Sequence, residues 1–487
     1  MKSIFKKRNK QVEALFESAG SSNKVMCVAF DYAKKMHKCV ICDGMGRQLH
    51  KSFNVYNNRD GLGFLLGKIS GACSKYHIKR EHVFFGGEDC GSFAFNFIHA
   101  LVSRGYLVIG MNARQTKIER ENALASNDLI DTIGVASMML KMKGRTIGEA
   151  TKDVHRIKHL RRLRKALLKA HSSSAQRIYK VTDQLLLDFL KQDESGLVPF
   201  SRASLWLMDE RFCIERIQTR QRPSLVKNLR NFNIKDPEGV ADKLKSLADN
   251  ALPPPDEMIP PLQRSLMEEK SLYTGLGKSL HDLDIDIAKQ LARTKGAMLT
   301  TIPGIGLRWA PALFIELGDP LRRRNVHSMA ALGGIVPGSK QTGGDDKDPV
   351  VGRRNRKCSS SLKLALMSGA FSIAQYGLKE MRESYRYDRE AGRDAKARMA
   401  QKLLRISLHI LDYGNFFVPP ALMTDYTVQQ MADYYEMMWP KVLVKWRDKG
   451  AILEATAPGA PLREWRNMAQ DLYKIKLNLK SPQTGRK

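Results

Sequence analysis

The chain has 487 residues, which exceeds one ordinary hydrophobic core and suggests about three domains. It carries 81 Lys and Arg residues against 50 Asp and Glu, and this net charge of +31 favours a polyanionic partner, with nucleic acid as the first candidate. No apolar stretch approaches the roughly 20 residues that a membrane-spanning helix needs, and no apolar signal core follows the basic start MKSIFKKRNKQ. These observations argue against a membrane protein and predict a cytosolic one.

Short apolar runs from Val25 onward predict three antiparallel strands, carried by VMCVAFDYAKK and by HKCVICDGMGRQLHKSFNV with its internal turn. A helical pattern (GLGFLLGKISGAC), a strand (VFFGG), a helix from about Ser92 to Ser103, a strand (YLVIGM) and a long helical pattern past Asn127 follow. Three strands followed by alternating helices and strands is the order of a ribonuclease H-like α/β domain.

Seven scattered cysteines, odd in number, fit reduced thiols better than a disulfide framework. Cys39 and Cys42 form a CxxC motif within a predicted strand. Residues three apart on a strand point to opposite faces, and no second Cys/His pair at zinc spacing completes a metal site. We therefore expect these thiols to be structural.

Residues 150–300 have a different character, with apolar side chains at spacings of three and four in HRIKHLRRLRKALLKAH, RIYKVTDQLLLDFLKQ and LQRSLMEEKSLYTGLGKSLHDLDIDIAKQLART. This spacing predicts long paired helices of the coiled-coil type. Between them, the prolines of RQRPSLVKNLRNF and ALPPPDEMIPP interrupt the helical pattern. They indicate either a loop or an inserted subdomain.

From Met298 the segment LTTIPGIGLRWAPALFIELG predicts a helix-hairpin-helix, in which the glycines free backbone amides to approach a phosphate. A polar tail with three tryptophans follows residue 420. The chain then divides into five expected segments: a basic N-terminal segment (1–23), the α/β domain (24–148), a helical coiled-coil region with a proline-containing insertion (149–297), a mostly helical C-terminal domain (298–420) and a C-terminal extension (421–487).

Four carboxylates form the most informative pattern. Asp31 ends the first apolar strand, and Glu88 follows VFFGG, so both emerge at one end of the sheet if these strands are parallel neighbours. Asp128 and Asp131, in NDLID, are three apart on a predicted helix, which puts them on one face with Cβ atoms about 5–6 Å apart. Converging carboxylates repel one another unless divalent cations lie between them, and Mg²⁺ suits hard oxygen ligands and phosphoryl chemistry. The alternative for each acid is an ordinary solvated charge.

At these residues the chain resembles the DEDD transposases of insertion-sequence family 110, which include the Piv-type DNA invertases and RNA-guided bridge recombinases. The N-terminal match runs through FDYAKKMHKCVICDGMGR, GGEDCGSF, RGYLVIGMNARQTK and NDLIDTIGVASM. The C-terminal match runs through LTTIPGIGLRWAPALFIELGD, SMAALGGIVPGSKQTGG and RRNRKCSSSLKLALMSGAF. The resemblance covers residues 24 to 420, and it implies a RuvC-like domain with catalytic, metal-binding acids at Asp31, Glu88, Asp128 and Asp131, a coiled-coil connection, and a second domain that bears a nucleophile.

In this family the nucleophile is a serine in a Ser-Gly element just after an apolar GxxP run, and that place is Thr342 here. Threonine keeps the hydroxyl but adds a methyl group, which stiffens χ1 and crowds in-line attack on a phosphodiester. Ser339 is an alternative nucleophile, and a further alternative is that Thr342 is only a turn residue. Ser359–Ser361 form the expected cap of a helix.

Nine residues are candidate nucleic-acid contacts because they are basic or lie in the Gly-containing turn. They are Arg114, Arg161, Arg162, Gly304, Gly306, Arg308, Arg353, Arg354 and Arg356. For the basic helix around Arg161 and Arg162, the alternative is a solvated face of the coiled coil.

The expected function is a site-specific DNA recombinase that moves an insertion sequence in the prokaryotic cytoplasm or nucleoid. The resemblance implies a structured guide RNA that pairs with donor and target DNA, and the four acids predict Mg²⁺. Assembly of both sites on two DNA duplexes implies a homo-oligomer, either a dimer or a tetramer, and no membrane partner is expected. Two other classes stay open. A RuvC-like nuclease or junction resolvase would use only the four acids and release free DNA ends, whereas a catalytically decayed DNA- or RNA-binding relative would bind equally well without either site.

Overall fold

The computed structural model describes residues 8–88, 93–111, 116, 127–148, 152–319, 325–340, 350–354, 358–419 and 427–480. The chain folds as two compact units, each assembled from segments that are far apart in the sequence. The first comprises Met1–Arg156, Thr294–Val442 and Pro461–Lys487, and the second comprises Ile157–Arg293 and Leu443–Ala460. Within the described ranges, no helix combines the length and the apolar character that a membrane crossing requires.

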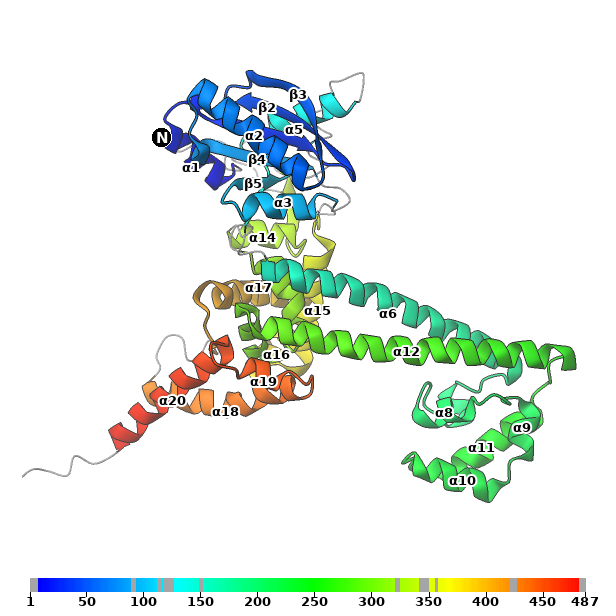
Figure 1. Ribbon diagram of the computed structural model, residues 1–487. Helices are drawn as coiled ribbons and strands as arrows, with labels where there is room; N and C mark the ends of the chain where they lie inside the picture. The colour runs from blue at the N-terminus through cyan, green and yellow to red at the C-terminus, as the bar shows by residue number, and fades with distance from the viewer. Residues whose placement is uncertain are drawn as a thin grey trace, which may run out of the picture. The chain divides into compact units, whose positions relative to one another are not determined.

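A six-stranded mixed sheet forms the α/β part of the first unit, with the strand order β3-β2-β1-β4-β5-β6 (Figure 1). The strands are β1 (Met26–Asp31), β2 (Met36–Asp43), β3 (Gln48–Tyr56), β4 (Val83–Glu88), β5 (Leu107–Gly110) and β6 (Arg145–Ile147). β1, β2 and β3 form the predicted antiparallel meander, while β4 pairs in parallel with both β1 and β5. β6 pairs antiparallel with β5 and was not predicted, because three residues are too few to show a strand pattern.

Strand side chains alternate between two apolar layers, and this alternation decides which helices each side chain faces. One layer contains α2 (Arg59–Tyr76) and α3 (Phe95–Val102), and the other contains α1 (Lys10–Ala19) and α5 (Asp128–Leu140). In β1, Val28 and Phe30 belong to the α2/α3 layer, whereas Cys27 and Ala29 belong to the α1/α5 layer. Neighbouring residues of one strand therefore meet different helices.

Two details follow from these layers. Cys39 lies in the α2/α3 layer and Cys42 in the α1/α5 layer, which confirms that the CxxC thiols are on opposite faces of β2. Helix α1, which the sequence analysis did not predict, is capped by the Asn9 side chain and buries Val12 and Leu15 against the sheet. Its apolar stripe is only two turns long, and among the surrounding basic residues this is too short to be recognised as a helical pattern.

The C-terminal part of the first unit is mostly helical, as predicted. Its elements are η5 (Lys295–Thr301), α13 (Ala310–Leu317), α14 (Val326–Leu332), α15 (Ser360–Tyr376), α16 (Lys379–Glu390), α17 (Ala395–Tyr413), α18 (Val428–Arg447, whose end belongs to the second unit), α20 (Pro461–Lys480) and a small hairpin of β7 (Pro337–Lys340) and β8 (Val350–Arg354). Helix α15 packs against α13, α16 and α17. The Trp465 indole donates to the Gly414 carbonyl at 2.6 Å, so the tryptophan-containing tail is folded onto the end of α17.

Two long helices dominate the second unit and confirm the prediction of paired helices (Figure 1). They are α6 (Lys152–Leu185) and α12 (Ile259–Ala292), of 34 residues each. They run antiparallel, because Arg164 pairs with Asp284 near one end of the hairpin while Ser174 Oγ donates to the Glu269 carbonyl at 2.9 Å nearer the other. Lys449 Nζ, from the segment Leu443–Ala460, lies 3.5 Å from the same Asp284 carboxylate.

Between the long helices the chain forms an inserted helical subdomain, which decides between the two alternatives that the prolines left open. Its helices are α7 (Gln192–Ser195), α8 (Arg202–Leu207), α9 (Ile214–Thr219), α10 (Arg222–Asn231) and α11 (Pro237–Asn250). They enclose an apolar core that also includes buried residues of α6 and α12, and in it the ring centroids of Phe189 and Phe212 lie 4.6 Å apart. Pro223 and Pro237 stand in the first turns of α10 and α11, where proline starts a helix instead of breaking one.

Candidate active site

Asp31 and Glu88 are the last residues of two neighbouring parallel strands. The register of β1 and β4 pairs Asp31 directly with Glu88, and both side chains are half-buried. This pairing confirms that the two carboxylates emerge at the same end of the sheet.

Both carboxylates also face the same layer of helices. Asp31 follows Cys27 and Ala29 at every second position of β1, and those two residues belong to the α1/α5 layer. Glu88 follows Phe84 and Gly86 in the same way, and a methyl group on Gly86 would lie 2.7 Å from the Met139 sulfur of α5. The side of the sheet that α5 covers is therefore the side to which Asp31 and Glu88 belong.

The direction of α5 brings its first turn to this end of the sheet. Near the C-terminal end of the helix, Met139 Sδ lies 3.8 Å from Cys27 Sγ, at the start of β1. α5 therefore runs antiparallel to β1. Asp131 precedes Met139 by a helical rise of about 12 Å, and Asp31 lies about 13 Å beyond Cys27 along the strand. The carboxylates of Asp131 and Asp31 therefore lie at similar positions along the direction of β1.

The first turn of α5 presents Asp128 and Asp131 as predicted. Asn127 caps the helix, its Oδ1 accepting from the Ile130 amide at 2.9 Å. Asp131 is half-buried and continues, in steps of four, the ridge of Val135 and Met139 that packs on the sheet, while Asp128 is exposed one turn earlier. The four predicted acids thus share one end and one face of the sheet. In the part of the chain that the structure describes, no three His, Cys, Asp or Glu side chains stand close enough to hold one metal ion.

Thr116 is a site residue that sequence reasoning missed. Its side chain is fully buried, and its hydroxyl donates a hydrogen bond to Glu88 Oε2. In the sequence it is one polar residue of the segment MNARQTK, with no spacing that ties it to an acid. Only the folded chain brings it to the end of β4.

The remaining predicted residues of the nucleophile region lie at or beyond the edge of the described structure. Thr342, Arg356 and, in the α/β part, Arg114 lie outside the described residues, and Arg353 and Arg354 are described only as backbone of β8. Lys340, the last residue of β7, pairs with Val350, the first of β8.

The serine cluster after this hairpin has the predicted capping role. Ser359 is the N-cap of α15, its Oγ accepting from the Leu362 amide at 3.3 Å. Ser361 Oγ donates to Glu316 Oε1 at 2.7 Å, and Ser359 Oγ donates to the other oxygen of that carboxylate at 3.3 Å. These hydroxyls bind α13 to the start of α15.

Gly304 and Gly306 of the PGIG turn differ in their surroundings. Gly304 has φ +87°, and a methyl group there would lie 2.8 Å from the Ile373 Cα of α15. Its carbonyl also accepts from Ser372 Oγ at 2.6 Å. Gly306 has open space around it, and Arg308 lies exposed with its guanidinium 5.1 Å from the Trp309 ring centroid. Close packing on α15 accounts for Gly304, and the phosphate contact remains a prediction.

Replacing Gly304 by Ala should destabilise the protein by about 3 kcal/mol, because the methyl group meets a helix backbone and the left-handed conformation is strained. Gly306→Ala is the matched control, with an expected change within about 0.5 kcal/mol. Denaturant unfolding of both variants measures the difference. Equal stability of the two variants would contradict the packing role of Gly304.

The basic face of α6 is partly engaged in ion pairs. Arg164 donates to both oxygens of Asp284, from Nε to Oδ1 and from Nη2 to Oδ2, the latter at 3.1 Å. Burial raises the pKa of the half-buried Asp284 carboxyl, but the hydrogen bonds and positive charges of Arg164 and Lys449 together lower it below its ordinary value. Arg162 is exposed and Arg161 is half-buried. Their proposed contact with nucleic acid remains a prediction.

The sheet order and the acids at its carboxyl edge are those expected of a DEDD-type transposase, and comparison with family models identifies the family. A model of the IS110 DEDD type, described as a transposase, matches residues 28–186, and a model described as the transposase IS116/IS110/IS902 family matches residues 296–386. The chain belongs to the IS110 family of transposases and is a DNA transposase with a RuvC-like domain. No curated protein matches the chain. Residues 187–295 lie between the two matched regions.

Proposed function

We propose that this transposase is a site-specific recombinase that moves an insertion sequence through a covalent protein–DNA intermediate. The observation that carries the proposal is the register of β1 and β4, which pairs Asp31 with Glu88 beneath the first turn of α5. The division into the five segments 1–23, 24–148, 149–297, 298–420 and 421–487 is part of the same proposal.

In this proposal Asp31, Glu88, Asp128 and Asp131 hold Mg²⁺. The donor set fits, because it consists only of carboxylate oxygens that share one end and one face of the sheet. When bound, Mg²⁺ supplies charge that stabilises the negative oxygens of a reacting phosphodiester. Thr116 keeps the Glu88 carboxylate oriented through its hydroxyl.

The proposed nucleophile is Thr342. Its hydroxyl oxygen forms a bond to the scissile phosphorus while one bridging P–O bond of the DNA breaks, and the hydroxyl proton passes to the leaving DNA oxygen. The new phosphodiester keeps the energy of the old one, so a hydroxyl of a second strand reverses the step and exchanges the strands. Arg353, Arg354 and Arg356 follow in the sequence as candidate donors to the phosphate.

The partners in this proposal are donor and target DNA and a structured guide RNA, bound by a dimer or tetramer. The net charge of +31 supports it, because a protein that binds an RNA backbone as well as two DNA duplexes needs a large excess of basic side chains.

The proposal is tested with the purified protein, labelled donor and target DNA, Mg²⁺ and the co-purified RNA. Strand transfer should be lost after ribonuclease treatment and after chelation by EDTA, and it should return when RNA or Mg²⁺ is added back. Strand transfer that persists in ribonuclease-treated protein would exclude the guide RNA but would not affect the proposed DNA cleavage and strand exchange.

Thr116 gives a separate prediction within this proposal. Thr116→Val keeps the side-chain shape but removes the donor to Glu88, and we expect the DNA cleavage rate or the Mg²⁺ affinity to fall about ten- to a hundredfold. Thr116→Ser should retain both. Cleavage rates measured across Mg²⁺ concentrations check this, and equal losses in the Val and Ser variants would mean that Thr116 acts through packing alone.

A further inference from the structure

The inserted helical subdomain contains a polar cavity that the transposase chemistry does not use. The cavity has a volume of about 260 Å³ and is lined by residues at the end of α9 and the start of α10. These residues are Arg216, Arg220, Gln221, Ser224, Leu225 and Asn228. All but Leu225 have polar side chains, and the cavity lies outside the regions that the two family models match.

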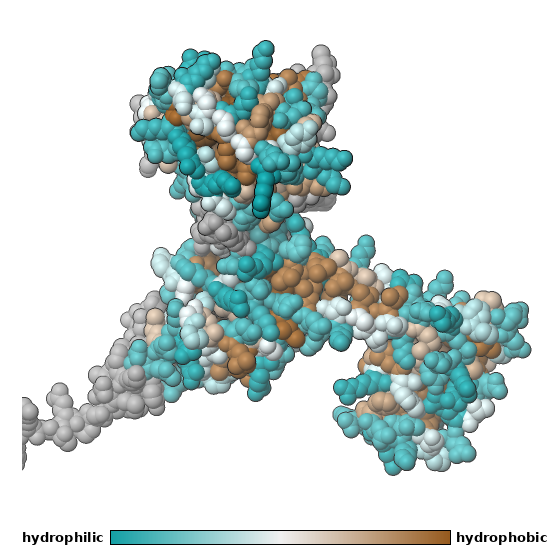
Figure 2. Space-filling model, in the orientation of Figure 1, coloured by the Kyte–Doolittle hydropathy of each residue, from teal (hydrophilic) through white to brown (hydrophobic). Residues whose placement is uncertain are grey.

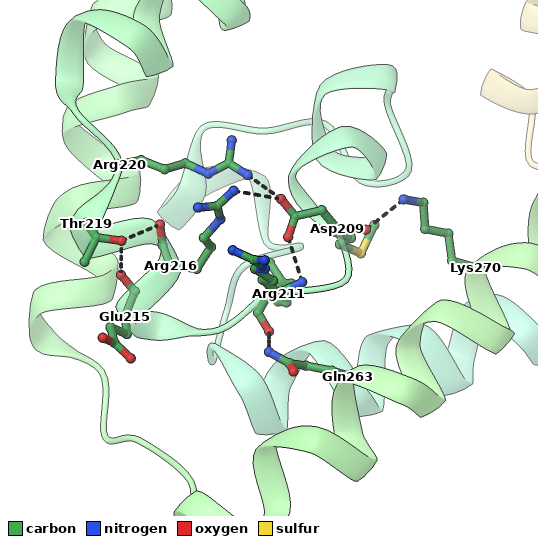
Figure 3. Close-up of polar contacts among 10 residues, drawn as sticks. Asp209, Arg211, Glu215, Arg216, Thr219, Arg220, Gln263 and Lys270 are labelled. Atoms are coloured by element: carbon green, nitrogen blue, oxygen red, sulfur yellow. Dashed lines mark hydrogen bonds and ion pairs between the residues drawn. The ribbon is translucent and has the colours of Figure 1, made fainter.

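The two arginines share one carboxylate. Asp209 Oδ2 accepts from Arg220 and lies 3.8 Å from Arg216 Nη2, while Asp209 Oδ1 accepts from the backbone amide of Arg211 at 3.0 Å (Figure 3). The Nε atoms of Arg216 and Arg220 are buried and have no hydrogen-bond partner among the described residues. One negative charge thus faces two guanidinium groups that still have unused donors.

Arg220 is held in a fixed position. Its guanidinium lies 4.7 Å from the Trp206 ring centroid, and its side chain is only 15% exposed. Burial lowers the pKa of the Arg220 guanidinium, and the Arg216 charge adds to this effect while Asp209 opposes it. The Asp209 carboxylate therefore does not fully offset the burial of the Arg220 guanidinium.

The start of α10 adds donors to the same cavity. Gln221, the N-cap residue, makes no side-chain capping hydrogen bond, so the amides of the first turn are not satisfied by a cap. Ser224 and Asn228 stand one turn apart on the cavity side of the helix, and Asn228 Nδ2 donates to the Ser224 carbonyl at 2.9 Å. A hydroxyl, two amide side chains and a helix start are groups that proteins commonly use on phosphates.

The surplus of positive charge is local to the cavity. The inserted subdomain carries about as many acidic as basic side chains, unlike the chain as a whole. Elsewhere on α10, Arg222 and Arg230 are paired with Asp242 and Glu238 of α11. A broad electrostatic surface is therefore absent from α10 and α11, and a single anionic group is the ligand that the cavity fits.

We propose that this cavity binds one phosphodiester group of a nucleic acid that the transposase holds. The proposal extends the proposed function, because it makes the insertion between α6 and α12 an additional binding site for the nucleic-acid backbone. A phosphodiester carries one negative charge and offers two oxygens to the guanidinium groups, which matches the donor set. RNA and DNA share this chemistry, and the experiment separates them.

The test measures binding of the full-length protein to two fluorescent probes of mixed sequence, an RNA stem-loop and a DNA duplex, over a range of salt concentrations. Arg216→Ala removes one cavity donor and leaves the Arg220–Asp209 pair in place. We expect it to weaken binding to at least one probe about three- to tenfold and to reduce the salt slope by about one. Lys227→Ala, which removes an exposed charge of α10 outside the cavity lining, is the matched control, with an expected change below about twofold.

Ser224→Glu is the second variant, because Ser224 is exposed and the new carboxylate would repel a phosphate without disturbing the core. If the variants lose affinity for the RNA probe alone, the site binds RNA, and if they lose affinity for the DNA probe alone, it binds DNA. Weaker binding of both probes means that the site accepts either backbone. The proposal is overturned if both cavity variants bind both probes as Lys227→Ala does. If the two cavity variants bind the probes more weakly than the wild type, but the wild type forms no covalent DNA adduct, the recombinase mechanism is refuted and the cavity proposal stands.

Discussion

Asp31→Asn should lower the rate of DNA cleavage by about a thousandfold or more, while the protein keeps its fold and its affinity for DNA. Asn has almost the same shape as Asp, and Asp31 ends its strand half-buried, so β1 can keep its pairing with β4. The substitution removes one of the negative charges that the proposed Mg²⁺ site requires. Glu88→Gln, on the paired strand, should give a loss of similar size.

The control for this prediction is Asp60→Asn, which removes an exposed carboxylate from the first turn of α2, on the opposite layer of the sheet. Cleavage of an end-labelled duplex, followed over time at saturating Mg²⁺, measures all three variants. Activity of Asp31→Asn within tenfold of the wild type would show that the strand-end acids are ordinary charges.

Thr342→Ala should abolish the covalent protein–DNA adduct, because alanine offers no oxygen for attack on the phosphorus. Thr342→Ser should retain the adduct and can form it faster, because serine lacks the methyl group that restricts χ1 next to the reacting oxygen. A denaturing gel of labelled DNA with protein and Mg²⁺ shows the adduct as a slowly migrating band. The Ser variant is the matched control, since it preserves the hydroxyl and changes only its surroundings.

Other outcomes of this experiment separate the competing mechanisms. If no variant forms an adduct and the DNA strands are still cut, the acids act with water and the protein is a nuclease or resolvase. If Thr342→Ala retains the adduct, another hydroxyl such as that of Ser339 is the nucleophile.

The sequence was most informative where local patterns decide structure. The apolar runs of the first three strands and of VFFGG predicted the sheet as far as β5, because strand periodicity is a local property. The strand-end positions of Asp31 and Glu88 then required only that β1 and β4 be parallel neighbours, and they are. The DxxD spacing of Asp128 and Asp131 depended on one helical turn alone.

Features that depend on contacts between distant residues could not be predicted. Thr116 contacts Glu88 across a separation of 28 residues, and no spacing in the sequence encodes that contact. The close packing of Gly304 on the backbone of α15, at Ser372 and Ile373, could not be predicted either, while its phosphate contact stays a prediction. The helices of the insertion could not be predicted from its prolines, because a proline that ends one helix can equally begin the next.

The second unit is discontinuous in the chain, and this has a consequence for its biosynthesis. Its hairpin of α6 and α12 is complete at Arg293, but the segment from Leu443 that places Lys449 beside Asp284, and Glu454 3.4 Å from Lys289, is made only after the helical part of the first unit. At about 5–20 residues per second, the ribosome needs roughly ten to thirty seconds to bridge that interval. During this time the nascent hairpin of α6 and α12 lacks its ion pairs with Lys449 and Glu454.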